Sequence, residues 1–157
     1  MEIRNHKVIY CVPGLKKTGP TQQLLNCVQL LDRDFSLEIA PLSLAGSGEY
    51  LARFESAVQI DPEGARQGGI LSKFRWLRSH LKKKNPAVVH THGLVSDLLV
   101  VLLSMLNLRR HKWVHVLTIR NDPFVDYPKK YGREGYLMAL VHILIIRVAQ
   151  VPVACSS

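Results

Sequence analysis

The segment of residues 8–21 constrains the fold more than any other part of the chain. An apolar run from Val8 to Pro13 leads into a glycine-containing turn, residues 14–21. Beyond the turn, apolar side chains recur at the spacing of one helix face, at Leu24, Leu25, Val28 and Leu31. The sequence therefore predicts a strand, a turn and an amphipathic helix in immediate succession.

The turn also contains residue types that favour an anion: Gly14, Lys16, Lys17, Thr18, Gly19 and Thr21. Backbone N–H groups at a helix N-terminus are unpaired and carry partial positive charge, which makes this turn a candidate phosphate-binding loop. The alternative is that the two glycines only allow the backbone to change direction.

The rest of the chain alternates between predicted strands and helices. Strands are predicted at 36–44, 57–61, 86–93, 113–120 and 151–155, helices at 49–55, 70–84, 94–108 and 136–149, and loops at 62–69 and 124–135. This alternation indicates a mainly parallel sheet covered on both faces, because parallel neighbours need crossover connections. The predicted fold is one α/β, Rossmann-like three-layer domain spanning residues 1–157.

Ligands of such folds bind beyond the carboxyl ends of the strands. This rule predicts that the turn at 14–21, the strand end near His92, and the cluster Arg120, Asn121 and Asp122 share one rim. The cluster offers hydrogen-bonding groups for a phosphorylated or polyhydroxylated ligand. The alternative is that Asp122 begins a turn with the following proline and that Arg120 pairs with it.

The residues at key positions argue against two nucleotide-binding motifs. Gly14 and Gly19 have the glycine spacing of a P-loop, but Pro20 stands where that loop needs its lysine. A dinucleotide site needs G-x-G-x-x-G and an acidic residue ending the second strand, whereas that predicted strand ends at Ser43 and Leu44.

Metal binding and nucleophilic catalysis are not expected either. His90 and His92 point to the same side of a strand, but no third ligand has recognisable spacing, so packed or hydrogen-bonded histidines are favoured. His92 is the one expected to face a ligand, since Gly93 marks the rim. No G-x-S-x-G elbow occurs, and the cysteines, which lie in apolar surroundings, are expected to be buried thiols of a reduced, cytosolic protein: Cys11, Cys27 and Cys155.

The formal charge of +9, from 21 Lys and Arg against 12 Asp and Glu, implies an anionic partner or an anionic membrane surface. Nucleic acid is not expected, because aromatic residues make up only 7% and no nucleic-acid-binding signature occurs. The helix at 70–84 has a buried stripe predicted at Ile70, Phe74, Leu77 and Leu81, and a basic outer face at Arg75, Arg78, Lys82 and Lys83. This face is either a solvated surface or a contact with lipid phosphates.

No export signal or membrane span is predicted. The N-terminus is polar, and the apolar stretch 137–146 ends at Arg147, short of the roughly 18 residues that a spanning helix needs. The expected location is the cytoplasm, with peripheral contact at the inner face of the membrane.

Taken in order, these blocks resemble the N-terminal domain of GT-B glycosyltransferases of family 4 (group 1). Residues 19–26 resemble the glycine turn and first helix of that family, and residues 88–93 with 96–99 resemble its "VVHxHG" strand and helix. The next family block corresponds to residues 118–123, 126–127 and 131–132, and the closing strand to residues 153–156.

The resemblance implies transfer of a sugar from a nucleotide-sugar co-substrate, with retention at the anomeric carbon and without a metal or other cofactor. It implies a lipid-linked glycan acceptor on this domain, in bacterial surface polysaccharide synthesis, and a donor diphosphate facing the turn at 14–21. His92, Gly93, Asn121 and Asp122 would line the sugar or acceptor cleft, and Arg120 and His92 are the catalytic candidates.

The sequence departs from the family in two respects. Many members carry histidine where Arg120 stands, and no C-terminal donor-binding domain with its Glu-x7-Glu site follows this domain within the 157 residues. The chain alone is therefore expected to be inactive without that partner domain. The alternative function is a stand-alone Rossmann-like module that binds phosphorylated ligands or anionic membrane without catalysis.

Overall fold

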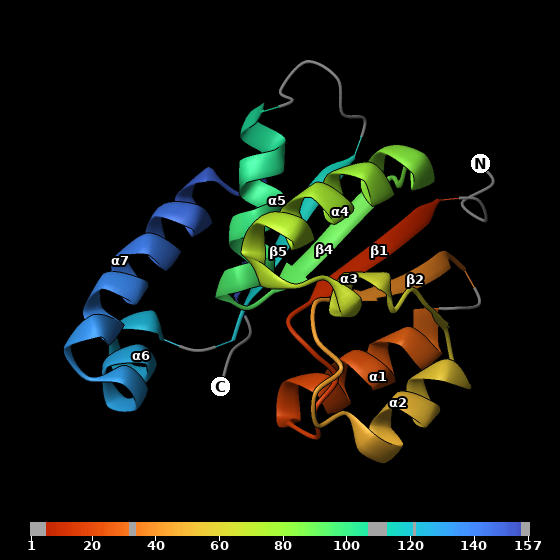
Figure 1. The fold of residues 1–157 in the computed structure, drawn as a ribbon, viewed down its shortest axis with the longest axis horizontal. Coiled ribbons are helices and arrows are strands. Elements are labelled where there is room, and N and C mark those ends of the chain that lie inside the picture. Colours follow the sequence, from red (N-terminus) through yellow and green to blue (C-terminus); the bar gives the residue numbers. More distant parts are fainter. Residues whose placement is uncertain (1–5, 32–33, 107–112, 121, 155–157) are drawn as a thin grey trace.

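The computed structural model describes residues 6–31, 34–106, 113–120 and 122–154, in which six parallel strands form one sheet (Figure 1). The strands are β1 (Lys7–Val12), β2 (Ser36–Pro41), β3 (Gln59–Ile60), β4 (Val88–His92), β5 (Val114–Ile119) and β6 (Val151–Ala154). Their order in the sheet is β3-β2-β1-β4-β5-β6. The predicted α/β, Rossmann-like three-layer fold is confirmed, with a sheet that is parallel throughout.

Helices cover both faces of the sheet (Figure 1). They are α1 (Gly19–Leu31), α2 (Gly48–Glu55), α3 (Glu63–Arg66), α4 (Gly69–Lys84), α5 (Leu94–Leu106), α6 (Pro123–Tyr131) and α7 (Arg133–Val148). On one face, Leu77 of α4 and Leu99 of α5 pack with Ile9 and Val89 of the central strands. On the other face, Leu25 of α1 and Phe54 of α2 pack with Tyr10 and Ile39 of the strands.

The side on which successive strands are added to the sheet changes between β1 and β4. After β1, strands β2 and β3 are added on one side of it, and β4, β5 and β6 are added on the other side. Ligand sites of open parallel sheets lie at such a switch point, beyond the carboxyl ends of the strands. The topology therefore places the ends of β1, β4 and β5, with the start of α1, around the position where a ligand is expected.

The predicted loop at 124–135 is wrong, because this segment forms α6 and the first turn of α7. Asp122 caps α6 by accepting a hydrogen bond from the Phe124 backbone N–H at 2.9 Å, and Pro123 occupies the first helical position. Both are helix-start signals that outweigh the internal Pro128. The predicted loop at 62–69 likewise contains α3.

Two burial predictions are also wrong. Cys11 is buried as expected, but Cys27 is exposed because it lies on the outer side of α1, next to Asn26. Cys155 lies outside the described residues. In α4, Leu77 and Leu81 are buried, whereas Ile70, in the first turn of the helix, is 53% exposed.

Candidate functional site

A pocket of about 130 Å³ lies at the carboxyl edge of β4 and β5. Its walls come from α1, from the ends of the two strands and from α6 and α7: Pro20, His92, Gly93, Thr118, Arg120, Pro123, Tyr127 and His142. Three of the sequence blocks expected at the rim thus meet in one cavity: the start of α1, the end of β4 and the segment after β5. No acidic side chain is among these lining residues.

His92 forms the inner wall of the pocket as the last residue of β4. Only 9% of the residue is exposed, and it makes no side-chain hydrogen bond to another described residue. Burial, with smaller effects of the Arg120 and His90 charges, lowers the pKa of His92 to about 4. The imidazole is therefore neutral at physiological pH and keeps one donor and one acceptor for a ligand.

His90 has a structural role, as expected for a packed histidine. Its Nε2 lies 2.5 Å from Thr118 Oγ1, and its ring contacts the Tyr10 ring at a centroid distance of 4.8 Å. Burial, with a smaller effect of the Arg120 charge, lowers the pKa of His90 to about 4. The bond to Thr118 fixes one wall of the pocket because Thr118 also lines it.

Arg120 connects the end of β5 to the first turn of α1. Its guanidinium donates hydrogen bonds to the Pro20 backbone oxygen and to Gln23 Oε1, both at 2.8 Å. The alternative in which Arg120 pairs with Asp122 is not what the structure shows, because Asp122 caps α6. The guanidinium charge therefore lies beside the pocket, where it favours an anionic or hydroxylated ligand. Asn121 lies outside the described residues.

Three side chains that the sequence analysis did not select form a hydrogen-bonded chain behind the pocket. Asp97 Oδ2 lies 3.1 Å from His142 Nε2, and His142 Nδ1 lies 2.8 Å from the Tyr127 hydroxyl. Asp97 is fully buried in α5, and His142 is 6% exposed in α7. Burial raises the pKa of Asp97, although its contacts with His142 oppose this effect.

The close approach of α6 and α7 creates this chain. A Cβ atom added at Gly135 would lie 2.3 Å from the backbone carbonyl atoms of Tyr127, so only glycine permits this packing. The signal in the sequence was the placement of single polar residues in apolar helices, Asp97 within 94–106 and His142 within 133–148. A charged or titratable residue buried at such a position needs a partner.

The turn at 14–21 contributes only Pro20 to the pocket lining. Within it, Thr18 Oγ1 lies 2.8 Å from Thr21 Oγ1 and 3.4 Å from the Thr21 backbone nitrogen, and Pro20 has no N–H. The first turn of α1 therefore presents fewer free N–H donors than the sequence pattern suggests. Lys16, Lys17 and Gly19 are exposed at the same edge of the molecule, and Gly14 passes close to Ser43.

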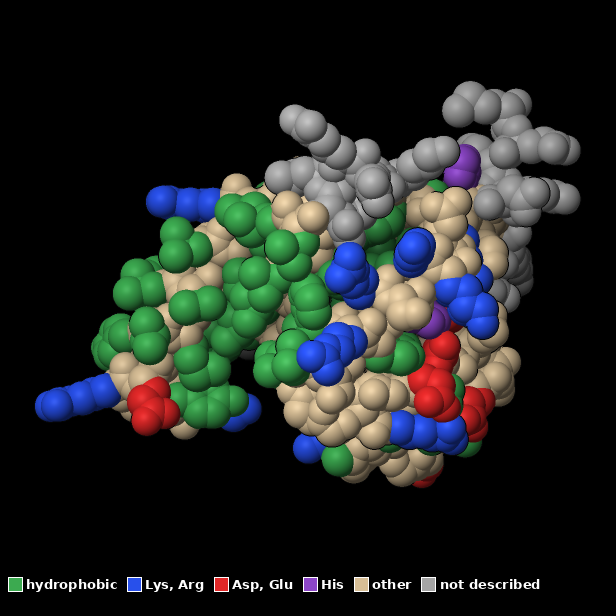
Figure 2. Space-filling model, turned by 45° about the horizontal axis from the view of Figure 1, so that its top comes forward, with side chains coloured by type: hydrophobic (Ala, Val, Ile, Leu, Met, Phe, Trp, Pro, Cys, Tyr) green, Lys and Arg blue, Asp and Glu red, His purple; other side chains and the backbone are tan. Residues whose placement is uncertain are grey.

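A second surface combines apolar and basic side chains. Exposed apolar residues lie on α5 and α7, and Figure 2 shows them gathered on one face beside a group of Lys and Arg side chains. The most exposed on α7 are Leu137 and Leu144, at 67% and 59%. The basic residues expected on α4 are exposed: Arg75, Arg78, Lys82 and Lys83. No helix within the described ranges is long and apolar enough to cross a membrane.

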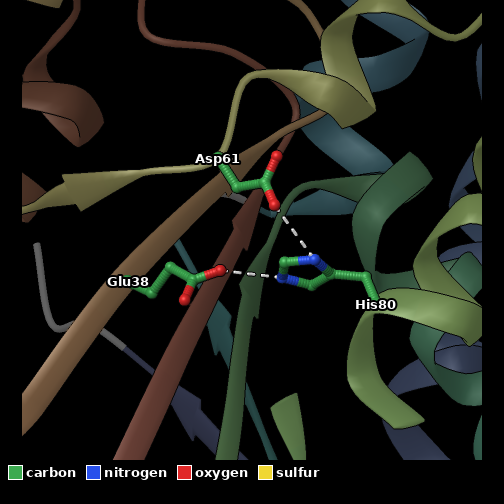
Figure 3. A group of neighbouring side chains, drawn as sticks. All are labelled: Glu38, Asp61 and His80. Carbon is green, nitrogen blue, oxygen red and sulfur yellow. Dashed lines mark ion pairs between the residues drawn. The ribbon is translucent and has the colours of Figure 1, made fainter. Parts of the chain in front are cut away.

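Glu38, Asp61 and His80 form the group that could be considered for a metal ion, because one ligand atom of each lies within 4.8 Å of the others (Figure 3). However, the two ring nitrogens of His80 face different carboxylates, at 2.9 Å from Glu38 and 3.2 Å from Asp61. One imidazole cannot bind a single ion through both nitrogens.

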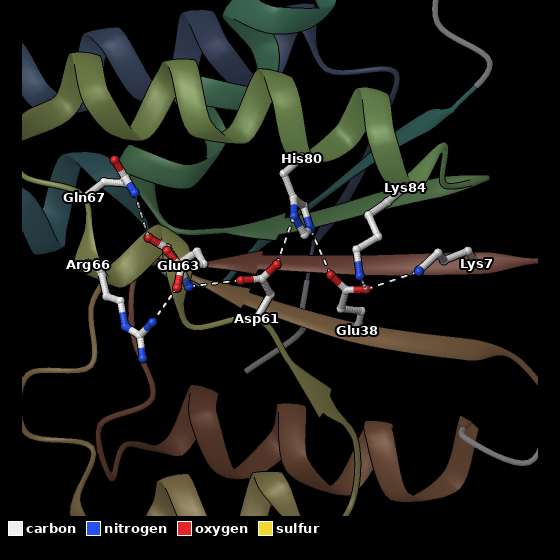
Figure 4. Close-up of polar contacts among 8 residues, drawn as sticks. All are labelled: Lys7, Glu38, Asp61, Glu63, Arg66, Gln67, His80 and Lys84. Carbon is white, nitrogen blue, oxygen red and sulfur yellow. Dashed lines mark hydrogen bonds and ion pairs between the residues drawn. The ribbon is translucent and has the colours of Figure 1, made fainter.

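The charges around this group also oppose a metal ion. Lys84 and Lys7 place their ammonium nitrogens 2.8 and 3.2 Å from Glu38 Oε2, and Asp61 accepts a hydrogen bond from the Glu63 backbone N–H (Figure 4). Burial alone would raise the pKa of Glu38, but His80, Lys84 and Lys7 together lower it to about 2. The geometry fits a buried ion-pair cluster that joins β1, β2 and α4.

Comparison with protein-family models and with curated proteins yields no match for this chain.

Proposed function

We propose that this chain is the acceptor-side half of a retaining glycosyltransferase that uses a nucleotide-sugar donor. The observation that carries the proposal is the convergence of three sequence blocks on one pocket, through Pro20 of α1, His92 of β4 and Arg120 after β5. The same blocks, in the same order, are those that resemble family 4 glycosyltransferases. The lipid-linked acceptor, the cytoplasmic location and the role in bacterial polysaccharide synthesis are part of this proposal.

The chemistry of the pocket supports a sugar as its ligand. A neutral imidazole at His92, the hydroxyl groups of Thr118 and Tyr127, and the Arg120 charge surround the space without a lining carboxylate. Sugars are bound by such a combination of hydrogen-bonding groups. The exposed Lys16 and Lys17 lie in the turn before α1, where they would face the donor diphosphate across a cleft completed by the partner domain.

Ligand-observed saturation-transfer NMR tests this proposal on the 157-residue chain. The probes are farnesyl-diphosphate-linked N-acetylglucosamine and UDP-glucose. We expect the ring protons of the lipid-linked sugar to be saturated by the protein, and His92→Ala to weaken this effect. His6→Ala, which changes an exposed histidine near the N-terminus, is the matched control. Absence of saturation transfer to any sugar-containing probe would contradict the proposal.

The second candidate function is a module without catalysis that binds anionic membrane, or phosphorylated ligands, through its basic surfaces. The surface in Figure 2 favours it, since exposed apolar residues of α7 lie beside basic side chains. An interfacial contact of this kind combines apolar burial with attraction to anionic lipids.

Vesicle sedimentation at two salt concentrations tests the membrane contact. Phosphatidylglycerol-containing vesicles are expected to bind the chain at 20 mM NaCl and to release it at 500 mM NaCl, because salt screens exposed charges. Replacing Arg75, Arg78 and Lys82 by glutamine should abolish binding, whereas Lys129→Gln, which changes an exposed lysine on α6, is the control. Failure to bind anionic vesicles at low salt would exclude the membrane role.

A further inference from the structure

We propose that the pocket contains a subsite for a sugar hydroxyl, in which the Tyr127 oxygen accepts the hydrogen bond and Asp97 and His142 set its direction. The inference takes from the proposed function only the choice of a sugar as the ligand. Tyr127 is the binding residue, and Asp97 and His142 are positioning residues that act through it.

Asp97 is the buried end of this series of hydrogen-bonded side chains. Asp97 is fully buried, and its Oδ2 lies 3.1 Å from His142 Nε2. With Asp97 ionised, the state that its hydrogen bond with His142 favours, the proton lies on Nε2 of His142, because a carboxylate has only acceptor atoms. In a neutral imidazole the other nitrogen, Nδ1, is then an acceptor.

The tautomer of His142 determines whether the Tyr127 hydroxyl donates or accepts the hydrogen bond between them. Nδ1 of His142 lies 2.8 Å from the Tyr127 hydroxyl oxygen, so the phenol donates its only proton to Nδ1. The lone pairs of the Tyr127 oxygen remain, and Tyr127 lines the pocket. The Tyr127 oxygen is consequently a hydrogen-bond acceptor in the pocket. It favours a ligand group that donates a hydrogen bond, such as a sugar hydroxyl.

Tyr127 is suited to recognition and not to nucleophilic or acid–base chemistry. Burial, with smaller effects of the Asp97, Tyr131 and Asp126 charges, raises the pKa of Tyr127 to about 12. The phenol therefore stays protonated at physiological pH. Its ring also stacks on the His142 ring at a centroid distance of 5.6 Å, which limits rotation of the side chain.

The rest of the pocket complements this acceptor. His92 is neutral and has both a donor and an acceptor nitrogen without a described side-chain partner, while Arg120 offers only donors. A sugar ring presents hydroxyl groups that donate and accept at once. Donors at His92 and Arg120 and an acceptor at Tyr127 can therefore hold neighbouring hydroxyl groups of one ring.

The positioning role is tested by the tautomer of His142, which long-range ¹H–¹⁵N correlation NMR reports at pH 8 without any ligand. We expect a neutral ring with the proton on Nε2. Asp97→Asn, whose amide can donate as well as accept, is expected to populate the Nδ1–H tautomer. Asp126→Asn, on α6, is the matched control. A wild-type ring that is charged, or protonated on Nδ1, would overturn the inference.

The subsite is tested by titration with the methyl glycosides of glucose, galactose, mannose and N-acetylglucosamine. At least one is expected to shift the Nδ1 resonance of His142, because a bond to the Tyr127 oxygen polarises its O–H bond. Tyr127→Phe should weaken that glycoside by about 3- to 10-fold, the effect of one hydrogen bond. Tyr136→Phe, on the exposed side of α7, should have no effect.

The outcomes separate this inference from the proposed function. A glycoside that shifts His92 but binds Tyr127→Phe as tightly as wild type would overturn the Tyr127 subsite and leave the glycosyltransferase proposal standing. If no glycoside shifts His92 or His142, the sugar subsite is overturned. Saturation transfer to the lipid-diphosphate sugar then decides separately whether the proposed function survives.

Discussion

Glu38→Gln should remove a pH-dependent contribution to stability that the buried ion-pair cluster supplies. The substitution keeps the shape of the side chain but leaves Lys7, Lys84 and His80 without the carboxylate that they contact. The pKa of Glu38 is about 2 in the folded chain, against an ordinary value of 4.5. This difference corresponds to about 3 kcal/mol of stability at pH 6.

The sign follows from which state binds the proton first. Because the folded pKa is depressed, the unfolded chain takes up a proton as the pH falls below 4.5, and the contribution declines until the pH passes about 2. About 40% of it should remain at pH 3. The free-energy difference between wild type and Glu38→Gln is thus expected to shrink by about 2 kcal/mol between pH 6 and pH 3.

Urea unfolding followed by circular dichroism at both pH values measures this difference. Glu55→Gln, which changes an exposed glutamate on α2, is the matched control and should be stable to within about 0.5 kcal/mol of wild type at both pH values. Addition of 1 mM ZnCl₂ should not shift the wild-type midpoint, since the cluster is an ion-pair network. A difference between wild type and Glu38→Gln that is unchanged or larger at pH 3 would refute this account, and a zinc-dependent stabilisation would refute the ion-pair interpretation.

Three further predictions concern packing, thiol reactivity and the pocket. Gly135→Ala should lower the thermal midpoint, because the added methyl meets the α6 backbone and overpacking costs about 1–3 kcal/mol, whereas Gly68→Ala, with open space around it, should not. In native protein, iodoacetamide should modify Cys27 while Cys11 stays protected, since burial raises the pKa of the Cys11 thiol. Peptide mass spectrometry measures this, and modification of Cys11 before Cys27 would contradict it. NMR titration should find the His92 midpoint near 4, and a midpoint above 6 would contradict its burial beside a positive charge.

Much of the fold was accessible from the sequence because the strands and most helices carry strong local signals. Segments 8–13 and 113–120 are apolar runs bounded by turns, and both are strands. The hairpin of α6 and α7 was missed because Pro128 and Gly135 are ordinarily loop signals. In the structure, the Asp122 cap overrides the proline, and the glycine permits close helix packing.

The candidate site was only partly predictable. His92 and Arg120 follow strands directly, so the general rule for parallel sheets located them at the rim. The partners of Asp97 could not be found in this way, because His142 lies 45 residues away in the chain and meets it only through packing of α7 on α5. Glu38 was missed for the same reason, since its partners come from β1 and α4.

The central claim is that the pocket at the carboxyl edge of β4 and β5 binds a sugar. The most direct measurement is a histidine side-chain NMR spectrum recorded during titration with farnesyl-diphosphate-linked N-acetylglucosamine. The account predicts that the ring resonances of His92 and His142 shift together while those of His80 and His115, which lie outside the pocket lining, stay in place. Unchanged His92 and His142 resonances at saturating probe, or equal shifts of all four rings, would contradict it.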